Sequence, residues 1–478
     1  MKFFKERDII GILQKECFTG KKIDPLRLQA GLQLYETLSF SQGKAFEPYI
    51  KEILPNIMNC IADAKEPVRA CANAANQQII RNFSNYAIKQ VVPMFLEGLK
   101  TDNWRGKYAA VEAVGNMAHC APKQISGFLP DIVKALREVL NDTHEKVHEA
   151  AIKAVSKIGS VIKCPEVADL LDVIILALGN SNLHLNACLD ALLKTSFVHA
   201  IDAPSLSLLV PLVDIGLTMH DNTSKQMASK LMGNICNLTQ DPEDLLPYMK
   251  ILIPAIKNSL FDSIPEIRAS ASKALGKLSK GLGLANSIEL LEWLNMNVHR
   301  KDLAPSERSG AAQGLSEVVS THGDNFFSNQ CKEIIALARS KDIGLRESYR
   351  NVMAYLPTSF GGFVDYLLVM LPIMIEGLAD ESEEVRKVSM RNVKICIQQY
   401  GKKASELLCK PILAMMFDKD SRVRMSSSIL MYQLVKEMEN DIIKSQPKYI
   451  NMQMKYSILS GMFILKFDPI DKVQIQAS

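Results

Sequence analysis

The hydrophobic positions of this chain recur at helical spacing, and Leu367–Tyr400 shows the pattern most clearly. Two apolar sets each fall on one side of a 3.6-residue period. They are Leu367, Leu368, Leu371, Met374, Ile375 and Leu378, and then Val385, Val388, Val393 and Ile397. Between them, Asp380 and Ser382 can cap a new helix, and nearby glutamates favour its positive N-terminal end. The stretch predicts two amphipathic helices joined by a tight turn.

The same turn chemistry recurs at steps of 38 to 41 residues. The markers are Asp63, Asp102, Asp142, Asn180, Asp221, Asp262, Asp302, Asp342, Asp380 and Asp418, with Asp468 following after 50 residues. An aliphatic-basic pair often comes five and six places later, as in Val68-Arg69, Val147-His148, Ile267-Arg268, Val385-Arg386 and Val423-Arg424. A proline recurs within the first helix, at Pro55, Pro93, Pro130, Pro211, Pro254, Pro372 and Pro411.

A period near 39 residues with this content is the HEAT-repeat pattern. Each helical pair has an apolar face that it buries only against neighbouring pairs. The sequence therefore predicts an all-α fold, a HEAT-repeat α-solenoid of about eleven repeats, continuous and without linkers. Enlarged loops are expected at Lys280–Asn286 and Asn440–Gln453. The last unit stops just after its turn, so we expect either a longer protein or a partner that covers its exposed face.

Composition narrows the function classes. Hydrophobic residues make up 47% and charged residues 23%, and the net charge is +4 with a pI of about 8.4. This charge is too mild to indicate a nucleic-acid binder, although local basic patches remain open. The ten cysteines show no paired spacing, which favours free thiols in a reducing compartment. No signal peptide or membrane-length apolar run is present, and we expect a cytoplasmic protein.

Catalytic and cofactor chemistry is not predicted. No phosphate-binding glycine loop occurs, and Gly281 with Gly283 is interpreted as a helix cap followed by a loop. His144 and His148 have the spacing of two metal ligands, but they flank a repeat turn and are interpreted as a solvated face. We therefore expect no enzyme, no metal and no cofactor. Trp104 and Trp293 are interpreted as packing anchors or contact points, and the sequence does not decide between these roles.

The basic residues divide into two groups. Those in phase with the turn acids are predicted to form a structural ladder between repeats. Those out of phase are candidates for ribosome or partner contact: Lys387, Arg391 and Lys394 along one helix face, Lys402 and Lys403 just beyond, and Arg346 and Arg350 with Arg339 and Lys341 one repeat earlier. Two interpretations remain open, a solubilising helix surface and a phosphate-binding stripe for RNA. Aromatic residues suited to base stacking are not interleaved there.

Four stretches resemble a known family. Glu307–Val319 (ERSGAAQGLSEVV) and Arg346–Arg386 resemble the very large HEAT-repeat activators of the general-control kinase that phosphorylates initiation factor two alpha. Ala45–Arg69 and Phe197–Val213 resemble both these activators and the HEAT domain of fungal elongation factor three. The resemblance covers nearly the whole chain. It divides the chain into a partial N-terminal repeat (1–42), repeats similar to elongation factor three (43–300), repeats with the strongest likeness (301–440), and an enlarged loop with a truncated repeat (441–478).

The resemblance implies a ribosome-binding scaffold in translational control. Its implied partners are the ribosome, through rRNA and ribosomal proteins, and an ABC-class protein, with the kinase bound through a segment beyond this chain. Neither a membrane nor DNA is expected as a partner. The absence of a Walker motif excludes elongation factor three itself. Two alternatives remain: another HEAT scaffold, such as a nuclear transport receptor or a phosphatase regulatory scaffold, and an enzyme, which lacks any visible catalytic constellation.

Overall fold

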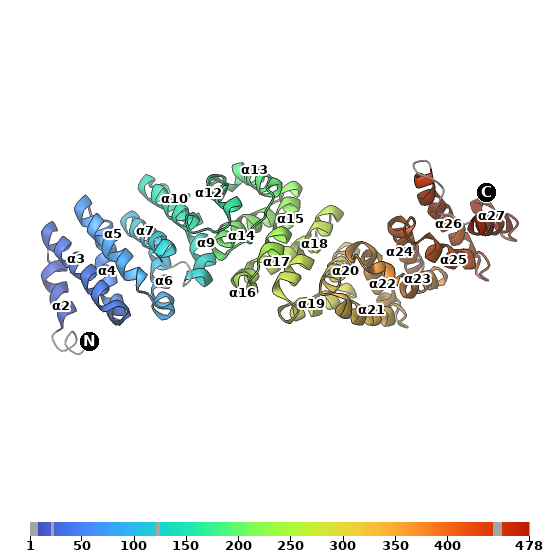
Figure 1. The fold of residues 1–478 in the computed structure, drawn as a ribbon, viewed down its shortest axis with the longest axis horizontal. Helices are drawn as coiled ribbons and strands as arrows, with labels where there is room; N and C mark the ends of the chain where they lie inside the picture. Colours follow the sequence, from blue (N-terminus) through green and yellow to red (C-terminus); the bar gives the residue numbers. More distant parts are fainter. Residues whose placement is uncertain (1–7, 21–22, 121–124, 443–451, 478) are drawn as a thin grey trace. The chain divides into compact units, whose positions relative to one another are not determined.

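The computed structural model describes residues 8–20, 23–120, 125–442 and 452–477 (Figure 1). Within these residues the regular structure is entirely helical. The chain divides into two compact units, Met1–Ala255 and Ile256–Ser478. The division falls inside helix α17 (Met249–Leu260).

Unit 1 begins with short helices and continues as helical pairs. Its elements are α2 (Ile9–Leu13), the π-helix η1 (Gln14–Phe18), α3 (Pro25–Gln42), η2 (Gly43–Tyr49), α4 (Ile50–Ile61), α5 (Glu66–Arg81), α6 (Asn85–Leu99), α7 (Trp104–Cys120), η3 (Ser126–Phe128), α9 (Leu129–Val139), α10 (Glu145–Gly159), α11 (Pro165–Ala168), α12 (Leu171–Gly179), α13 (Ser181–Lys194), α14 (Ala203–Thr218), α15 (Asn222–Leu238), α16 (Pro242–Leu245) and η4 (Leu246–Tyr248).

Unit 2 repeats the same order. Its elements are α18 (Pro265–Leu282), η5 (Ala285–Ser287), α19 (Ile288–Val298), α20 (Pro305–Thr321), α21 (Asp324–Ala338), α22 (Ile343–Ser359), η6 (Phe363–Tyr366), α23 (Leu367–Glu376), η7 (Gly377–Ala379), α24 (Glu383–Tyr400), α25 (Ser405–Met415), α26 (Ser421–Ile442), α27 (Met452–Leu465) and α28 (Asp471–Ala477).

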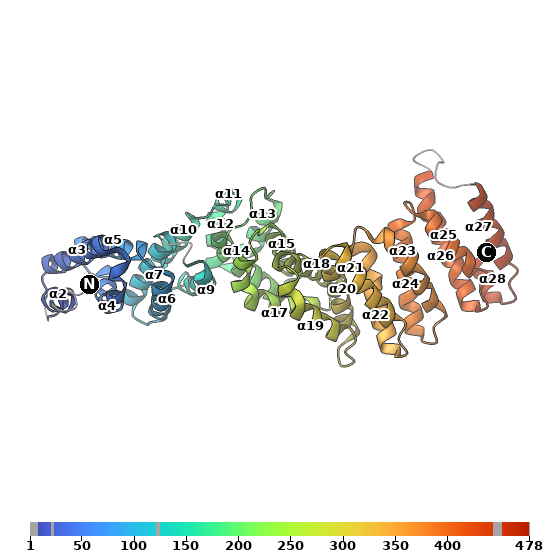
Figure 2. The same ribbon diagram turned by 60° about the horizontal axis from the view of Figure 1, so that its bottom comes forward.

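Within each unit a first helix packs against the second helix of its own pair. The pairs are α4/α5, α6/α7, α9/α10, α12/α13 and α14/α15 in unit 1, and α19/α20, α21/α22, α23/α24, α25/α26 and α27/α28 in unit 2. Second helices also pack on one another, in the series α3, α5, α7, α10 and in the series α18 to α28 by even numbers (Figure 2). With α17 and α18 as a further pair in chain order, eleven pairs occur among the described residues. This confirms the predicted all-α solenoid of about eleven repeats.

The predicted turn ladder is present as well. In five turns an arginine donates from Nη1 to two carbonyl oxygens of its own turn, as Arg69 does to Asp63 at 3.0 Å and Ala64 at 2.8 Å. The other four are Arg268, Arg346, Arg386 and Arg424. Ion pairs to the next turn connect consecutive repeats: Arg346 to Asp380 at 2.9 Å, Arg424 to Asp468 at 2.6 Å and Lys107 to Asp142 at 2.6 Å.

The register of the turn acids is less even than the sequence spacing predicts. Asp380 lies three residues before α24, and its Oδ1 accepts from the amide of Ser382 at 2.9 Å. Asp342 instead stands directly before α22 and caps that helix by accepting from Gly344, so Ser340 occupies the equivalent turn position. Asn180 and Asp221 also stand directly before their second helices. Asp102 lies two residues before α7, so these four markers do not occupy the turn position of Asp380.

The predicted enlarged loop at Lys280–Asn286 is also wrong. Helix α18 continues to Leu282, Gly283 ends it with a φ of 77°, and η5 begins at Ala285. A left-handed glycine closes this connection in few residues because it has no Cβ to clash. The other enlarged loop was predicted at Asn440–Gln453. Helix α26 ends at Ile442 and α27 begins at Met452, and 443–451 lie outside the described residues.

The Arg346–Asp380 pair gives a pH-dependent prediction. Burial acts to raise the pKa of the Asp380 carboxyl, but the hydrogen bonds from Arg346 and Ser382 outweigh it and lower that pKa. The stabilisation is then fully present above the unfolded aspartate pKa of about 3.9 and is lost as the pH falls through the lower folded value. Asp380→Asn should cost about 1.5 kcal/mol at neutral pH, since a charge-assisted bond becomes a neutral one.

Urea unfolding at several pH values tests this expectation. Wild type and Asp380→Asn should converge as the pH falls through the lowered folded pKa of Asp380, because the protonated carboxyl resembles the amide. A matched control is Asp302→Asn, whose exposed partner Arg300 makes it a surface pair of small expected effect. A stability difference for Asp380→Asn that stays constant over the whole pH range would contradict the prediction.

Candidate functional site

Helix α24 carries the exposed basic residues predicted from the sequence. Lys387 is exposed and its Nζ lies 2.9 Å from Glu383 and 3.0 Å from Glu384, one turn earlier. Arg391 is exposed and Lys394 is half-buried. These three residues, named here the α24 stripe, are spaced so that they share one helix face. Because two carboxylates already neutralise Lys387, Arg391 and Lys394 carry the more available charge.

Arg391 is held in place by the preceding repeats. Its guanidinium carbon lies 5.2 Å from the ring centroid of Tyr355 on α22. The hydroxyl of Tyr355 is 2.7 Å from Oγ of Ser309 on α20. Three consecutive second helices thus contribute to this contact, and the ring face favours the cation. Tyr355 and Ser309 lie in the two stretches with the strongest family resemblance, but their contact with the α24 stripe was not predicted because it joins different repeats.

Lys402 and Lys403 lie in the turn between α24 and α25, and both side chains are exposed. They therefore remain candidates for contact, at the end of α24 that follows Tyr400. Arg339 is exposed too, but its guanidinium forms an ion pair with Glu376.

Two of the predicted contact residues have structural roles. Arg350 is only 3% exposed and donates to the carbonyl of Ile373 and, at 3.4 Å, to Oγ of Ser389. Burial lowers the pKa of its guanidinium. Arg346 is half-buried and belongs to the ladder through Asp380. The prediction that Arg350 contacts a partner is wrong, because α22 packs the side carrying this residue against the next pair.

The other candidate sites are also explained by packing. His148 takes the position of a ladder arginine, with Nδ1 2.6 Å from the carbonyl of Leu140. His144 stacks on Trp104, with ring centroids 4.2 Å apart. Among the described residues no group of three or more His, Cys, Asp or Glu side chains has the arrangement of a metal site. Burial raises the pKa of several thiols, that of Cys60 to about 12, which makes them poor nucleophiles.

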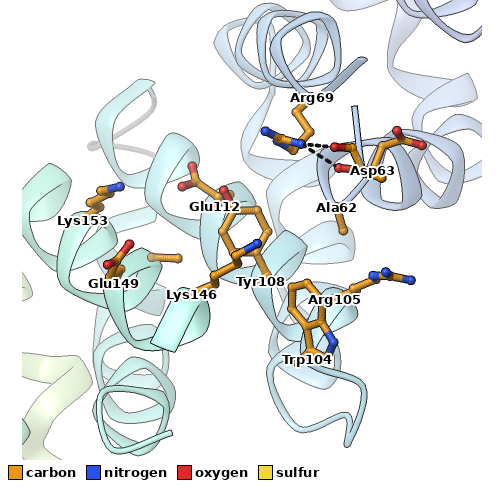
Figure 3. Close-up of a pocket in the computed structure, with 12 residues that line it drawn as sticks. Ala62, Asp63, Arg69, Trp104, Arg105, Tyr108, Glu112, Lys146, Glu149 and Lys153 are labelled. Atoms are coloured by element: carbon orange, nitrogen blue, oxygen red, sulfur yellow. Dashed lines mark hydrogen bonds between the residues drawn. The ribbon is translucent and has the colours of Figure 1, made fainter. Parts of the chain in front are cut away.

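Trp104 begins α7 at a repeat turn, whereas Trp293 lies within α19, and each of them packs beside a cation. Trp293 lies 5.4 Å from the ring of Phe261, and Nζ of Lys257 is 4.2 Å from its centroid. Trp104 additionally lines an open hollow on the second helices of unit 1 (Figure 3). Within the described part of the chain, no helix combines the length and the apolar character that crossing a bilayer requires.

Three family models match the sequence. The model described as EF3 N-terminal HEAT repeat matches residues 1–155, and the model described as Elongation factor 3/GNC1 HEAT repeat matches residues 184–288. A third, described as Vacuolar 14 Fab1-binding region, matches residues 384–458.

Curated relatives extend these matches along the chain. The eIF-2-alpha kinase activator GCN1 of Dictyostelium discoideum is 38% identical over 88% of this chain, which covers 16% of that protein. The stalled ribosome sensor GCN1 of Homo sapiens is 38% identical over 86% of the chain, which covers 15% of it. Elongation factor 3B of Saccharomyces cerevisiae is 28% identical over 49% of the chain, which covers 22% of it. The chain thus spans about one sixth of the length of these GCN1 relatives.

Proposed function

We propose, on the premise that this chain belongs to the GCN1 family of HEAT-repeat proteins, that it is a non-catalytic scaffold which binds ribosomes in translational control. The family resemblance predicted from Glu307–Val319 and the other three stretches is confirmed by these relatives. The single observation that carries the functional proposal is the 38% identity, over 86% of the chain, to a protein named as a sensor of stalled ribosomes.

The partners follow from the same premise. The ribosome is the proposed primary partner, in the cytoplasm, and the part shared with elongation factor 3 supports this assignment. The more specific partners that we propose are an ABC-class protein and the kinase that phosphorylates initiation factor two alpha. The structural roles of the histidines and of the buried thiols support a scaffold rather than an enzyme.

At residue level we assign the ribosome contact to the α24 stripe, with Lys402 and Lys403 as an extension. Within the described residues neither Arg391 nor Lys394 forms an ion pair, and Tyr355 holds Arg391 in position. Positively charged side chains along one helix face, one of them held beside an aromatic ring, suit the phosphate backbone of rRNA. Arg346 and Arg350 are left out of the contact because the ladder and the interior use them.

Ribosome cosedimentation of the charge-reversed variant Lys387→Glu, Arg391→Glu, Lys394→Glu tests the assignment. We expect binding to weaken at least about tenfold at low salt, and the dependence of log K on log salt to become shallower by roughly one to two units, since each lost phosphate contact removes less than one unit. Among the single changes, Lys387→Glu should have the smallest effect because Glu383 and Glu384 already neutralise it.

The matched control reverses three exposed lysines of unit 2 outside the stripe, Lys280, Lys332 and Lys410. It changes the net charge by the same amount, so it separates a local contact from a general loss of positive charge. Equal cosedimentation of the stripe variant and the control would overturn the residue assignment. Failure of the wild-type protein to cosediment with ribosomes at any salt concentration would overturn the function.

A further inference from the structure

A hollow of about 530 Å³ lies on unit 1 where the turn before α5 meets the second helices α7 and α10 (Figure 3). Its aromatic lining is Trp104 and Tyr108 from α7. Figure 3 shows Trp104 and Arg105 at one side of the hollow and Glu149 and Lys153 of α10 at the other. Residues from three consecutive repeats therefore enclose a space large enough for several side chains of another molecule.

Three exposed cations border this hollow, and two of them lie beside the indole of Trp104. Cζ of Arg105 lies 5.3 Å and Nζ of Lys146 lies 5.8 Å from the ring centroid of Trp104. Both side chains are exposed, and so is Lys153. No ion pair engages these three cations within the described residues. The indole itself is held by the stacked ring of His144, at an interplanar angle of 12°. Cations held beside an aromatic ring lose little freedom when they bind an anion.

The acidic residues of the same hollow restrict what the anion can be. Glu112 forms an ion pair with Lys157 at 3.1 Å and Asp63 accepts from the amide of Lys65 at 2.8 Å, whereas Glu149 is exposed on α10 between Lys146 and Lys153. A continuous polyanion such as an RNA backbone would place phosphates against Glu149 as well as against the cations. A polypeptide places its charges singly, so it can set carboxylates on the cations and avoid the glutamate.

The covered faces of Trp104 also favour a polypeptide ligand over a nucleic acid. His144 occupies one face, and the cations lie within 6 Å of the ring centroid, so a nucleobase has no free indole face on which to stack. What the hollow offers is an indole edge, a phenol ring and adjacent guanidinium and ammonium groups. Tryptophan, tyrosine and arginine are the residues that dominate the binding energy of protein interfaces.

We propose that the Trp104 hollow is a docking site for a protein partner. It takes a short acidic segment whose carboxylates bind Arg105 and Lys146, while a neighbouring aliphatic side chain covers the edges of Trp104 and Tyr108. Lys153 binds a further carboxylate at the α10 side. This site lies in unit 1 and is separate from the α24 stripe of unit 2, so it adds a protein contact to the proposed ribosome contact and does not depend on it.

The fluorescence of Trp104 provides a direct test. The chain contains two tryptophans, so Trp293→Phe leaves Trp104 as the single fluorescent indole. The probe is an acetylated peptide of four Asp-Glu-Leu repeats, titrated at low salt, with a peptide of four Lys-Arg-Leu repeats for comparison. We expect a saturable change in emission with the acidic peptide only. Arg105→Glu with Lys146→Glu should weaken its binding by about tenfold or more, as expected when like charges oppose each other in an interface.

Two further variants keep the test decisive. Lys89→Glu with Lys230→Glu makes the same change in net charge at exposed positions of unit 1 outside the hollow, and it should bind as the Trp293→Phe protein does. Arg105→Gln with Lys146→Gln removes the charges without introducing repulsion, and should lose several-fold affinity with unchanged helical circular dichroism. The proposal is overturned if the charge-reversed protein binds the acidic peptide unchanged. It is also overturned if a uridine oligonucleotide, and not the peptide, changes the emission of Trp104.

Discussion

Replacing Arg350 with alanine is expected to lower the free energy of unfolding of the α22–α24 region by about 3 kcal/mol, within the range for a buried hydrogen-bonded side chain left without its partners. The carbonyl of Ile373 explains the size of the effect. The amide of Gly377, four residues on, donates instead to Ile375, so Arg350 supplies the donor that the helix does not. Alanine would leave this carbonyl unpaired and open a cavity.

The controls separate hydrogen bonding from volume. Arg350→Met keeps the side-chain stem and removes a buried charge, so it should cost only about 1 to 2 kcal/mol. Arg391→Ala, which removes an exposed arginine one repeat later, should cost less than about 1 kcal/mol. Urea unfolding followed by circular dichroism measures all three variants. An Arg350→Ala protein as stable as Arg391→Ala would show that the buried hydrogen bonds contribute nothing.

The same comparison separates stability from binding. Arg391→Ala should weaken ribosome cosedimentation while leaving unfolding nearly unchanged, because its charge faces outward. Arg350→Met should do the reverse, with an unchanged salt dependence of binding. These two arginines have the same residue type and occur on neighbouring second helices. Their roles differ because their environments differ. Arg350 donates to an interior carbonyl and stabilises the fold, whereas Arg391 lies beside a tyrosine ring at the surface and is proposed to bind.

This contrast shows what the sequence could predict. Helical spacing places Arg346 and Arg350 on one face of α22, but it does not say whether that face meets solvent or the next repeat. The helical pairs and the turn arginines were predictable because their chemistry is local: a turn acid, a capped helix and a basic residue six positions on. The orphan carbonyl of Ile373 arises where α23 passes into η7, a detail of backbone geometry that no periodicity indicates.

The candidate sites divide in the same way. The amphipathic pattern of α24 predicts which of its side chains are exposed, so Lys387 and Arg391 could be predicted as surface residues. The support from Tyr355 was missed because it comes from the preceding repeat. The Trp104 hollow needs three repeats to form, and the sequence signalled it only through one Trp-Arg pair at a turn. In stacked repeats, the pattern within a single repeat predicts the helices. A surface that several repeats share can be predicted only when the register of the stack is known.

Substitution of Gly310 by alanine is expected to destabilise the protein about as much as Arg350→Ala. It does so although it adds only one methyl group, in a helix, where alanine is normally favoured. A Cβ at Gly310 would overlap the backbone carbonyl oxygen of Leu260, so α20 could accept it only by moving away from the end of α17. We expect a loss of about 3 kcal/mol, at the upper end of overpacking costs, since the obstacle is backbone and not a flexible side chain. For a unit of this size this corresponds to a fall in melting temperature of roughly 6 to 12 °C.

Gly361→Ala is the matched control in the same unit, because no atom lies within 4 Å of the position its Cβ would take. It should shift the melting temperature by no more than about 2 °C, as expected for a surface change of less than 0.5 kcal/mol. If Gly310→Ala melts like Gly361→Ala, then α17 and α20 do not approach as closely as the structure indicates.

The Glu307–Val319 stretch that carries the family resemblance contains Gly310, and close helix packing is the physical reason for a glycine there. The resemblance in that stretch thus reports the stacking of repeats, whereas the contact chemistry proposed for this protein lies in the α24 stripe and the Trp104 hollow.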